Sequence, residues 1–139
     1  MKTARMMTGI AAAALIATIS LASYTAQSQG VRLGDIKRTN LMKEDLSIPG
    51  REVIQVRVDF PPGVDAVRHN HPGEELVYII EGELEYQLDG RSPVTLKAGD
   101  VLLIPYGTHH AVKNVGSGNA AELATYIVEK GKPLSALGK

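Results

Sequence analysis

Three histidines and one glutamate have the residue types and spacing of a metal site. His69 and His71 lie two residues apart in a segment flanked by predicted strands, so an extended backbone would point both imidazoles to one side. Glu75 follows beyond a Pro-Gly turn, and His110 begins a later strand. Three neutral imidazoles and one carboxylate suit a first-row divalent cation, and in an octahedral site they would leave two adjacent positions open. Open positions are typical of a reactive site, whereas His69 and His71 alone would also be typical of an exposed loop.

Five further polar residues are candidates for a ligand pocket around such a site. They are Gln55, Arg57, Arg68, Tyr106 and His109. Gln55 and Arg57 alternate with apolar side chains and could hold an anionic substrate, while Arg68 and His109 neighbour candidate metal ligands. Tyr106 lies in the turn before the last ligand and is expected at the pocket mouth. The alternatives are a solvated surface position and, for Tyr106, a place in the core or an interface.

The composition excludes several classes of function. The 139 residues contain no cysteine, which excludes a disulfide framework, a thiolate zinc site, an iron–sulfur cluster, a cysteine nucleophile and a lipid-modified cysteine anchor. Equal numbers of basic and acidic residues provide no electrostatic footprint for nucleic acid, and no dense Lys/Arg cluster suggests anionic lipid. We therefore expect a small-molecule ligand or substrate, and no nucleic-acid partner.

The first 28 residues have the three-part layout of a secretory signal peptide. Lys2 and Arg5 precede an apolar run over 9–22, and small residues follow. Cleavage is expected near 22 or 28, because both places offer small residues where a signal peptidase reads them. An uncleaved transmembrane anchor is the alternative, although the run is short for a span of about 20 residues. The expected protein is periplasmic or secreted, with no membrane contact after cleavage.

The rest of the chain predicts short strands separated by Gly- and Pro-containing turns. Apolar and polar residues alternate over 53–60 and again over 83–88, where a hairpin turn follows. Residues 75–80 are apolar on both faces, so a layer should cover each face. Further strands are expected at 94–97, 101–104, 110–115 and 120–129.

This many short strands indicates an all-β sandwich or barrel. The expected organisation is an extended N-terminal arm over 29–50, one β-barrel domain over 51–130 and a loose tail over 131–139.

The candidate ligands and the turns around them resemble the cupin family. The first cupin motif has the order and spacing of Gly63, His69, His71, Glu75 and Gly82. The second has those of Gly99, Pro105, Gly107, His110 and Asn114. The resemblance implies a single cupin barrel, also called a double-stranded β-helix or jelly roll. It further implies one divalent transition metal ion inside the barrel, bound by His69, His71, Glu75 and His110.

The resemblance also implies a homodimer, formed by packing barrel faces or exchanging N-terminal strands. The apolar outer face of 76–80 supports that expectation independently.

Function is less determined, because cupins include dioxygenases, isomerases, decarboxylases, lyases and proteins that only bind or store. The leading hypothesis is a metal-dependent enzyme of dioxygenase or isomerase/decarboxylase type that acts on a small organic molecule. Glu75 could also act as a general base, as the resemblance to flavonol-cleaving cupins suggests. The alternatives are a non-catalytic periplasmic ligand- or metal-binding sensor and a structural dimerisation barrel with a vestigial site.

The metal could be copper, zinc, iron, manganese or nickel. An exported chain would bind its metal outside the cytoplasm, where raw affinity favours Cu²⁺ and Zn²⁺ over Mn²⁺ and Fe²⁺. We therefore expect copper or zinc.

Overall fold

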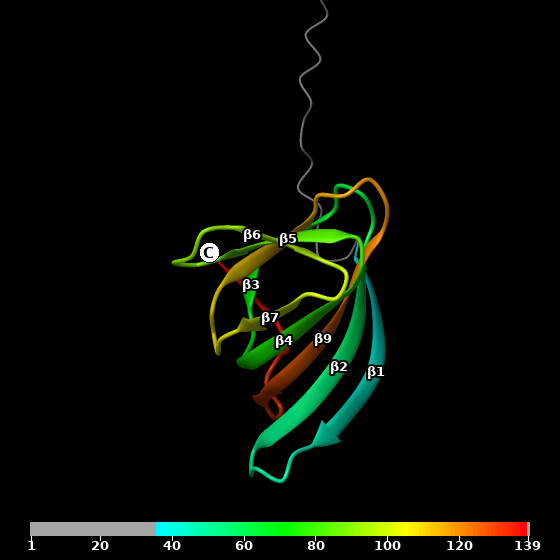
Figure 1. Ribbon diagram of the computed structural model, residues 1–139. Helices are drawn as coiled ribbons and strands as arrows, with labels where there is room; N and C mark the ends of the chain where they lie inside the picture. Colours follow the sequence, from blue (N-terminus) through cyan, green and yellow to red (C-terminus); the bar gives the residue numbers. More distant parts are fainter. Residues whose placement is uncertain (1–35, 139) are drawn as a thin grey trace, which may run out of the picture.

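The computed structural model describes residues 36–138, which form ten strands in two antiparallel five-stranded sheets (Figure 1). The first sheet has the order β1 (Lys37–Asp45), β2 (Arg51–Phe60), β9 (Ala120–Glu129), β4 (Gly73–Glu81), β7 (Val101–Ile104). The second sheet has the order β10 (Ala136–Leu137), β3 (Asp65–Asn70), β8 (His110–Asn114), β5 (Glu83–Leu88), β6 (Val94–Lys97). The all-β prediction is confirmed, and the two packed antiparallel sheets form the jelly roll that the sequence resemblance implies.

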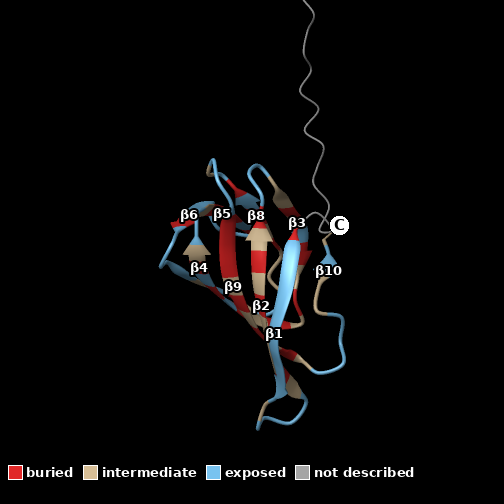
Figure 2. Ribbon diagram, turned by 90° about the vertical axis from the view of Figure 1, so that its right-hand side faces the viewer, coloured by how far each residue is buried: buried red, intermediate tan, exposed pale blue. Residues whose placement is uncertain are grey.

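The core lies between the two sheets, and alternate residues of inner strands such as β2 and β5 are buried in it (Figure 2). Val56, Val58 and Phe60 of β2 belong to the same buried core as Leu84 and Tyr86 of β5 in the other sheet. Full burial of one such side chain contributes about 1.5–3 kcal/mol. The period-two alternation in the sequence therefore identified the inner faces of both strands correctly.

The flanking segments supply edge strands. Within the expected N-terminal arm, β1 pairs along β2 from Lys37 to Asp45. Within the expected tail, β10 pairs with β3, with Ala136 opposite Asn70 and Leu137 opposite His69. The C-terminal segment thus runs beside the first candidate ligand.

The proposed signal peptide lies outside the described residues. In the range from 36 to 138, no helix is long and apolar enough to cross a membrane.

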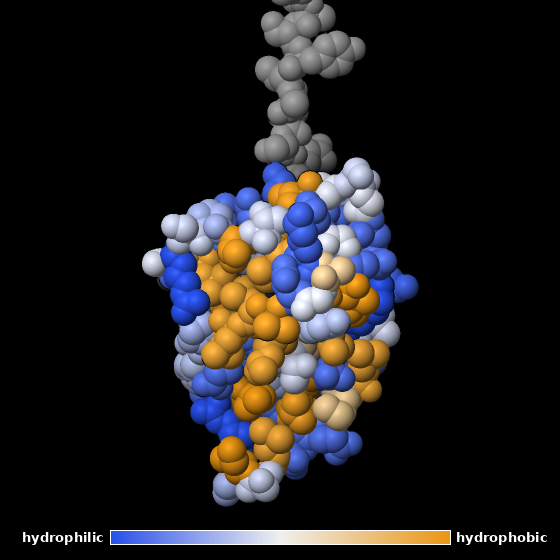
Figure 3. Space-filling model, viewed as in Figure 1, coloured by the Kyte–Doolittle hydropathy of each residue, from blue (hydrophilic) through white to orange (hydrophobic). Residues whose placement is uncertain are grey.

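The outer face of the first sheet is apolar where β4 and β7 lie side by side. Leu76 and Tyr78 of β4 and Val101 and Leu103 of β7 are exposed there, and Val101 retains 70% of its accessible surface. A broad apolar patch covers this face (Figure 3). The sequence predicted a layer over each face of 75–80, but within the described residues only the inner face of β4 is covered.

Gly73 permits the close approach of β4 to β9. A Cβ atom built at Gly73 would lie 2.0 Å from the carbonyl oxygen of Ile127, a distance that no real contact reaches. The adjacent backbone N–H of Glu129 donates to the carbonyl of Pro72 at 2.9 Å. This tight packing fixes the turn between His71 and Glu75.

Candidate metal centre

The two sheets bring the four predicted ligands to one place in the interior. His69 lies in β3 and His110 directly opposite it in β8, while His71 follows β3 and Glu75 lies in β4 of the other sheet. One ring nitrogen from each histidine lies within 4.8 Å of the other two. All four side chains are buried, and the most exposed residue, His69, retains 5% of its surface.

A β-bulge aims His69 inward. The pairing of β3 with β8 shifts register between Ala66 and His69, and both residues are buried although three positions separate them. Strict alternation would send one of the two outward, so the bulge re-aims the side chain, a common role of bulges beside functional sites.

Each histidine is held by a main-chain carbonyl at Nδ1. The acceptors are the carbonyl oxygens of Val67 for His69 at 2.7 Å, Leu134 for His71 at 2.6 Å and Thr108 for His110 at 3.1 Å. Because a carbonyl oxygen can only accept, Nδ1 carries the proton, and the Nε2 of a neutral ring presents its lone pair. Metal-binding histidines show this arrangement almost without exception.

Glu75 completes the set of acceptors. Its Oε2 lies 3.1 Å from Nε2 of His71 and 3.3 Å from Nε2 of His110. Oε2 of Glu75 and Nε2 of His71 are nevertheless buried without a hydrogen-bond partner. An unpaired lone pair beside a buried carboxylate is costly unless a cation joins them.

These acceptors therefore fit a divalent transition metal. Three imidazole nitrogens and one carboxylate oxygen are ligands that such ions accept, and orphaned acceptors are what an ion would satisfy. The metal's identity and the ligand roles of the individual residues stay predictions.

The electrostatics keep the site ready for a cation at neutral pH. Burial lowers the pKa of His69 to about 4, and the neighbouring His110 adds to that shift. Burial alone would raise the pKa of Glu75, but its interactions with His110 and His71 outweigh burial and hold it well below its usual range. His69 is thus neutral and Glu75 ionised, the forms that bind metal.

A second group of polar residues fills the interior beside the histidines. The ring of Tyr126 lies 4.7 Å from that of His71, and its hydroxyl accepts a hydrogen bond of 3.0 Å from Nη2 of Arg38. Further along β9, buried Glu122 accepts a hydrogen bond from the hydroxyl of Tyr86. Burial, together with the negative charge of Glu75, raises the pKa of Glu122 to about 8.

The sequence interpretation did not identify these residues as part of the interior polar group. The pocket candidates named from the sequence included none of Arg38, Tyr86, Glu122 and Tyr126. One signal was available, because Glu122 occupies the same alternation phase as the buried Ala124 and Tyr126. An acid in the apolar phase of a strand indicates an interior polar contact.

Gln55 and Arg57, two of the candidate pocket residues, lie on the outer side of the first sheet. Gln55 donates to Thr125 at 3.1 Å, and Arg57 pairs with Asp59 and Glu81 at 2.8 Å each. They alternate with the inward-facing valines of β2, so the structure does not bring them to the histidines.

The other three candidates lie at the periphery. Arg68 pairs with Asp89, Tyr106 is hydrogen-bonded to Glu129, and His109 is half-buried. The acidic partners of Arg68 and Tyr106, Asp89 and Glu129, are not among the candidate metal ligands.

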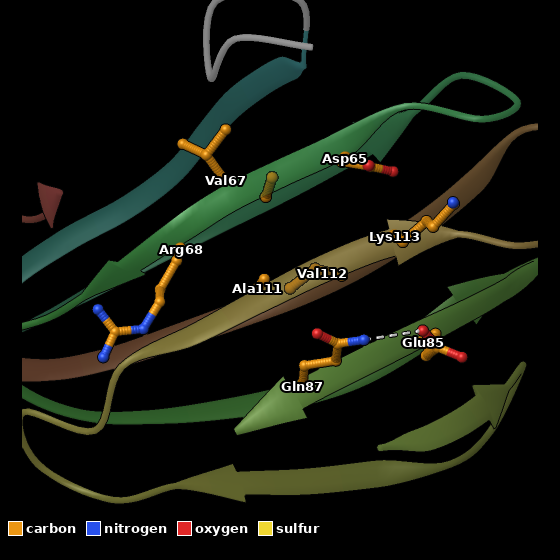
Figure 4. A pocket seen from close by; sticks show the side chains of 9 residues that line it. Asp65, Val67, Arg68, Glu85, Gln87, Ala111, Val112 and Lys113 are labelled. Atoms are coloured by element: carbon orange, nitrogen blue, oxygen red, sulfur yellow. Dashed lines mark hydrogen bonds between the residues drawn. The ribbon is translucent and has the colours of Figure 1, made fainter. Parts of the chain in front are cut away.

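Arg68 lines a hollow of about 380 Å³ on the outer side of the second sheet (Figure 4). Val67 of β3, Gln87 of β5 and Lys113 of β8 line it as well. On β8, Lys113 and Ala111 alternate with the buried His110 and Val112. The hollow and the histidines therefore lie on opposite faces of the same strands.

Comparison with known proteins identifies the family of the β-sandwich domain. The sequence matches the cupin domain family over residues 56–131. It is 30% identical over 96 residues to an oxalate-binding protein of Thermotoga maritima. The aligned region covers 68% of this chain and 78% of that protein. It is also 38% identical over 56 residues to a dimethylsulfoniopropionate lyase of Ruegeria pomeroyi, covering 40% of this chain and 28% of the lyase.

A solved structure gives the same fold. A Klebsiella pneumoniae protein with a double-stranded β-helix domain superposes with a TM-score of 0.64 at 24% identity, over 79% of this chain and 91% of that chain. The jelly roll, the buried histidine cluster and the match over 56–131 lead to one conclusion. This chain belongs to the cupin family.

Proposed function

We propose that this chain is an exported, metal-dependent cupin enzyme that acts on a small organic molecule. His69, His71, Glu75 and His110 would hold one divalent transition metal ion. The observation that carries the proposal is the convergence of buried Nε2 atoms and a carboxylate oxygen, two of them without any hydrogen-bond partner. Family membership and the small-molecule ligands named for cupin relatives support it.

A bound metal ion would supply Lewis-acid chemistry and a place for substrate at its open positions. The chain's own residues set the conditions for that chemistry. The three carbonyls at Nδ1 fix ring orientation, and burial of the site excludes bulk water. The lowered pKa of Glu75 favours its ionised form, so this carboxylate would also be able to accept a proton from substrate as a general base.

The first experiment measures metal content and turnover on one sample. The protein is purified from the periplasm or medium, analysed by elemental mass spectrometry, and tested for dioxygen uptake with phenolic and diketone substrates. We expect one copper, zinc, iron, manganese or nickel ion per chain. Uptake would assign the dioxygenase type, and isomerase or decarboxylase substrates would be tested on the same sample. Failure of the apo-protein to take up any of these metals would overturn the proposal.

A non-catalytic binding protein is the second candidate. One relative, matched over 78% of its length, is named as an oxalate-binding protein. This candidate predicts tight metal and ligand binding with no product from any substrate panel. Turnover by the metal-loaded protein that disappears in the His71→Ala variant would exclude it.

Export is supported by the composition of residues 1–28 alone. Fusing these residues to a reporter that is active only outside the cytoplasm tests it. A reporter signal, together with a shortened mature chain by mass spectrometry, is the expected result. An inactive fusion would contradict export, and an exported protein of unchanged mass would contradict cleavage.

We also propose a homodimer through the apolar outer face of β4 and β7. β7 is the edge of its sheet, and Val101 and Leu103 are exposed on it beside Leu76 and Tyr78. A second copy turned by a two-fold axis would present the same side chains to this face, so that each patch covers the other. Burial of this patch would supply the layer that the described residues lack.

A further inference from the structure

Arg38 reaches the interior from the edge of the first sheet. In the pairing of β1 with β2, Arg38 lies opposite Val58 and Asn40 opposite Val56. Directly opposite residues share a face of the sheet, and both valines are buried in the core. Arg38 and Asn40 therefore lie on the side of β1 that faces the interior, at the open edge of the sandwich.

A single side chain, that of Tyr126, lies between the Arg38 guanidinium and the candidate metal ligand His71. Nη2 of Arg38 donates at 3.0 Å to the hydroxyl of Tyr126, a residue with 1% of its surface exposed. The ring of Tyr126 contacts that of His71 at 4.7 Å, and its backbone pairs with Glu75. Arg38 itself is exposed, so a ligand arriving from solvent can contact it.

Arg38 also carries unused binding capacity. A guanidinium has five N–H donors, and within residues 36–138 that of Arg38 makes one hydrogen bond and has no carboxylate within ion-pair distance. By contrast, Arg57 pairs with two carboxylates and Arg68 with one. Glu122 is the buried acid that interacts electrostatically with Arg38. Its raised pKa of about 8 leaves it largely uncharged at neutral pH.

Two residues further along β1, at Asn40, a hollow begins that offers room for a ligand. It has a volume of about 410 Å³ and lies between β1 and the C-terminal segment, within the size range of small-molecule sites. Its walls include Asn40 and Lys43 of β1, Ile54 of β2 and Leu134. Ile54 is paired with Tyr126, and the Leu134 carbonyl accepts the Nδ1 proton of His71. The hollow is thus bordered by direct neighbours of the metal site.

We propose that Arg38 is an anion-binding residue at the mouth of the metal centre, and that the ligand is a small organic acid with two acidic ends. One end would bind the metal, and the other would pair with the guanidinium, whose planar fork matches a carboxylate. This inference rests on the proposed metal site and names the chemical class of its ligand. Lys43, on the same hollow, adds positive charge, although it already pairs with Glu52 at 3.2 Å.

The test measures binding rather than turnover. Apo-protein is first titrated with Mn²⁺ and Zn²⁺, and the loaded protein is then titrated with oxalate, malonate, succinate and acetate by calorimetry. Acetate is the internal control, because its single carboxylate can occupy the metal without reaching Arg38. The variants are Arg38→Gln, Arg38→Lys and the matched surface control Arg91→Gln.

We expect Arg38→Gln to weaken the best diacid by about 10- to 100-fold, the loss of one charge-assisted hydrogen-bonded pair. Metal affinity and acetate binding should change less than about threefold, the scale of a lost surface contact. Arg38→Lys should lose less, and Arg91→Gln should match wild type. Thermal melting confirms that each variant folds.

Two results would overturn the inference while leaving the metal site intact. One is metal-loaded wild type that binds no diacid more tightly than acetate. The other is an Arg38→Gln variant that binds the diacids as wild type does. Failure to bind Mn²⁺ or Zn²⁺ at all would instead refute the proposed function, so the two failures are distinguishable.

Discussion

Nδ1 of His71 donates a 2.6 Å hydrogen bond to the carbonyl oxygen of Leu134, 63 residues further along the chain. The hydroxyl of Ser135 lies 3.4 Å from the same nitrogen, and β10 continues beside β3. The C-terminal segment therefore orients one of the candidate metal ligands directly. A segment that the sequence alone suggested to be a loose tail is structurally part of the site.

Truncation after Lys132 tests this relationship. Loss of the Leu134 carbonyl leaves the Nδ1 proton of His71 without its acceptor, and loss of such a partner typically costs 10- to 100-fold in metal affinity, so we expect a fall of roughly that size. Competition titration with a chromophoric chelator measures it. A truncation after Gly138 keeps every described contact and should bind metal as the full chain does. Equal affinities of the two truncations would show that His71 does not need this carbonyl.

Two adjacent histidines provide a matched pair of variants. His110 is buried in the cluster, whereas its neighbour His109 is half-buried and belongs to no cluster of potential ligands in the described range. We expect His110→Ala to abolish stoichiometric metal binding and His109→Ala to retain it, as measured by elemental mass spectrometry after dialysis. Retention of metal by His110→Ala with wild-type affinity would contradict the ligand assignment.

Glu122 should make the protein less stable as pH rises. Its folded pKa of about 8 lies above its ordinary value of 4.5, because burial and Glu75 disfavour the charged form. Between those values the unfolded chain has released the proton that the folded protein still binds, so this group lowers stability from pH 4.5 towards 8. The variant Glu122→Gln is neutral throughout and should lose this contribution.

The measurement is the melting temperature of wild type and Glu122→Gln across that range. We expect the variant's melting temperature to rise relative to wild type as pH increases. His69 acts oppositely in both proteins, because its lowered pKa removes stability as pH falls from 6.5 towards about 4. It therefore cancels in the difference between the two curves. A difference that is independent of pH would show that Glu122 is ionised in the folded protein.

The proposed dimer depends on the outer apolar face of β4 and β7. Val101→Asp places a charge at the most exposed apolar position of that face and should convert dimers to monomers in sedimentation velocity runs. Val94→Asp is the control, because Val94 is also exposed but lies on β6 of the second sheet. A wild-type monomer at high concentration, or a Val101→Asp variant that remains dimeric, would exclude this interface.

The strands and the histidine cluster could be predicted from sequence for one physical reason. Both depend on short-range patterns: alternation over a few residues sets the inner face, and fixed turns separate His69, His71 and Glu75. Arg38 and Leu134 could not be predicted in the same way. They reach the site by edge-strand pairing with partners far away in the chain, and nothing local in their sequence records that pairing.

The main-chain carbonyls at Nδ1 have a consequence for redesign. Because the acceptors of His69, His71 and His110 belong to the backbone, no side-chain replacement at Val67, Leu134 or Thr108 deletes them as chemical groups. The orientation of the rings is thereby decoupled from the identity of their neighbours. Side-chain replacements at those three positions leave the three acceptors in place, whereas insertions or deletions that displace the backbone would move the rings.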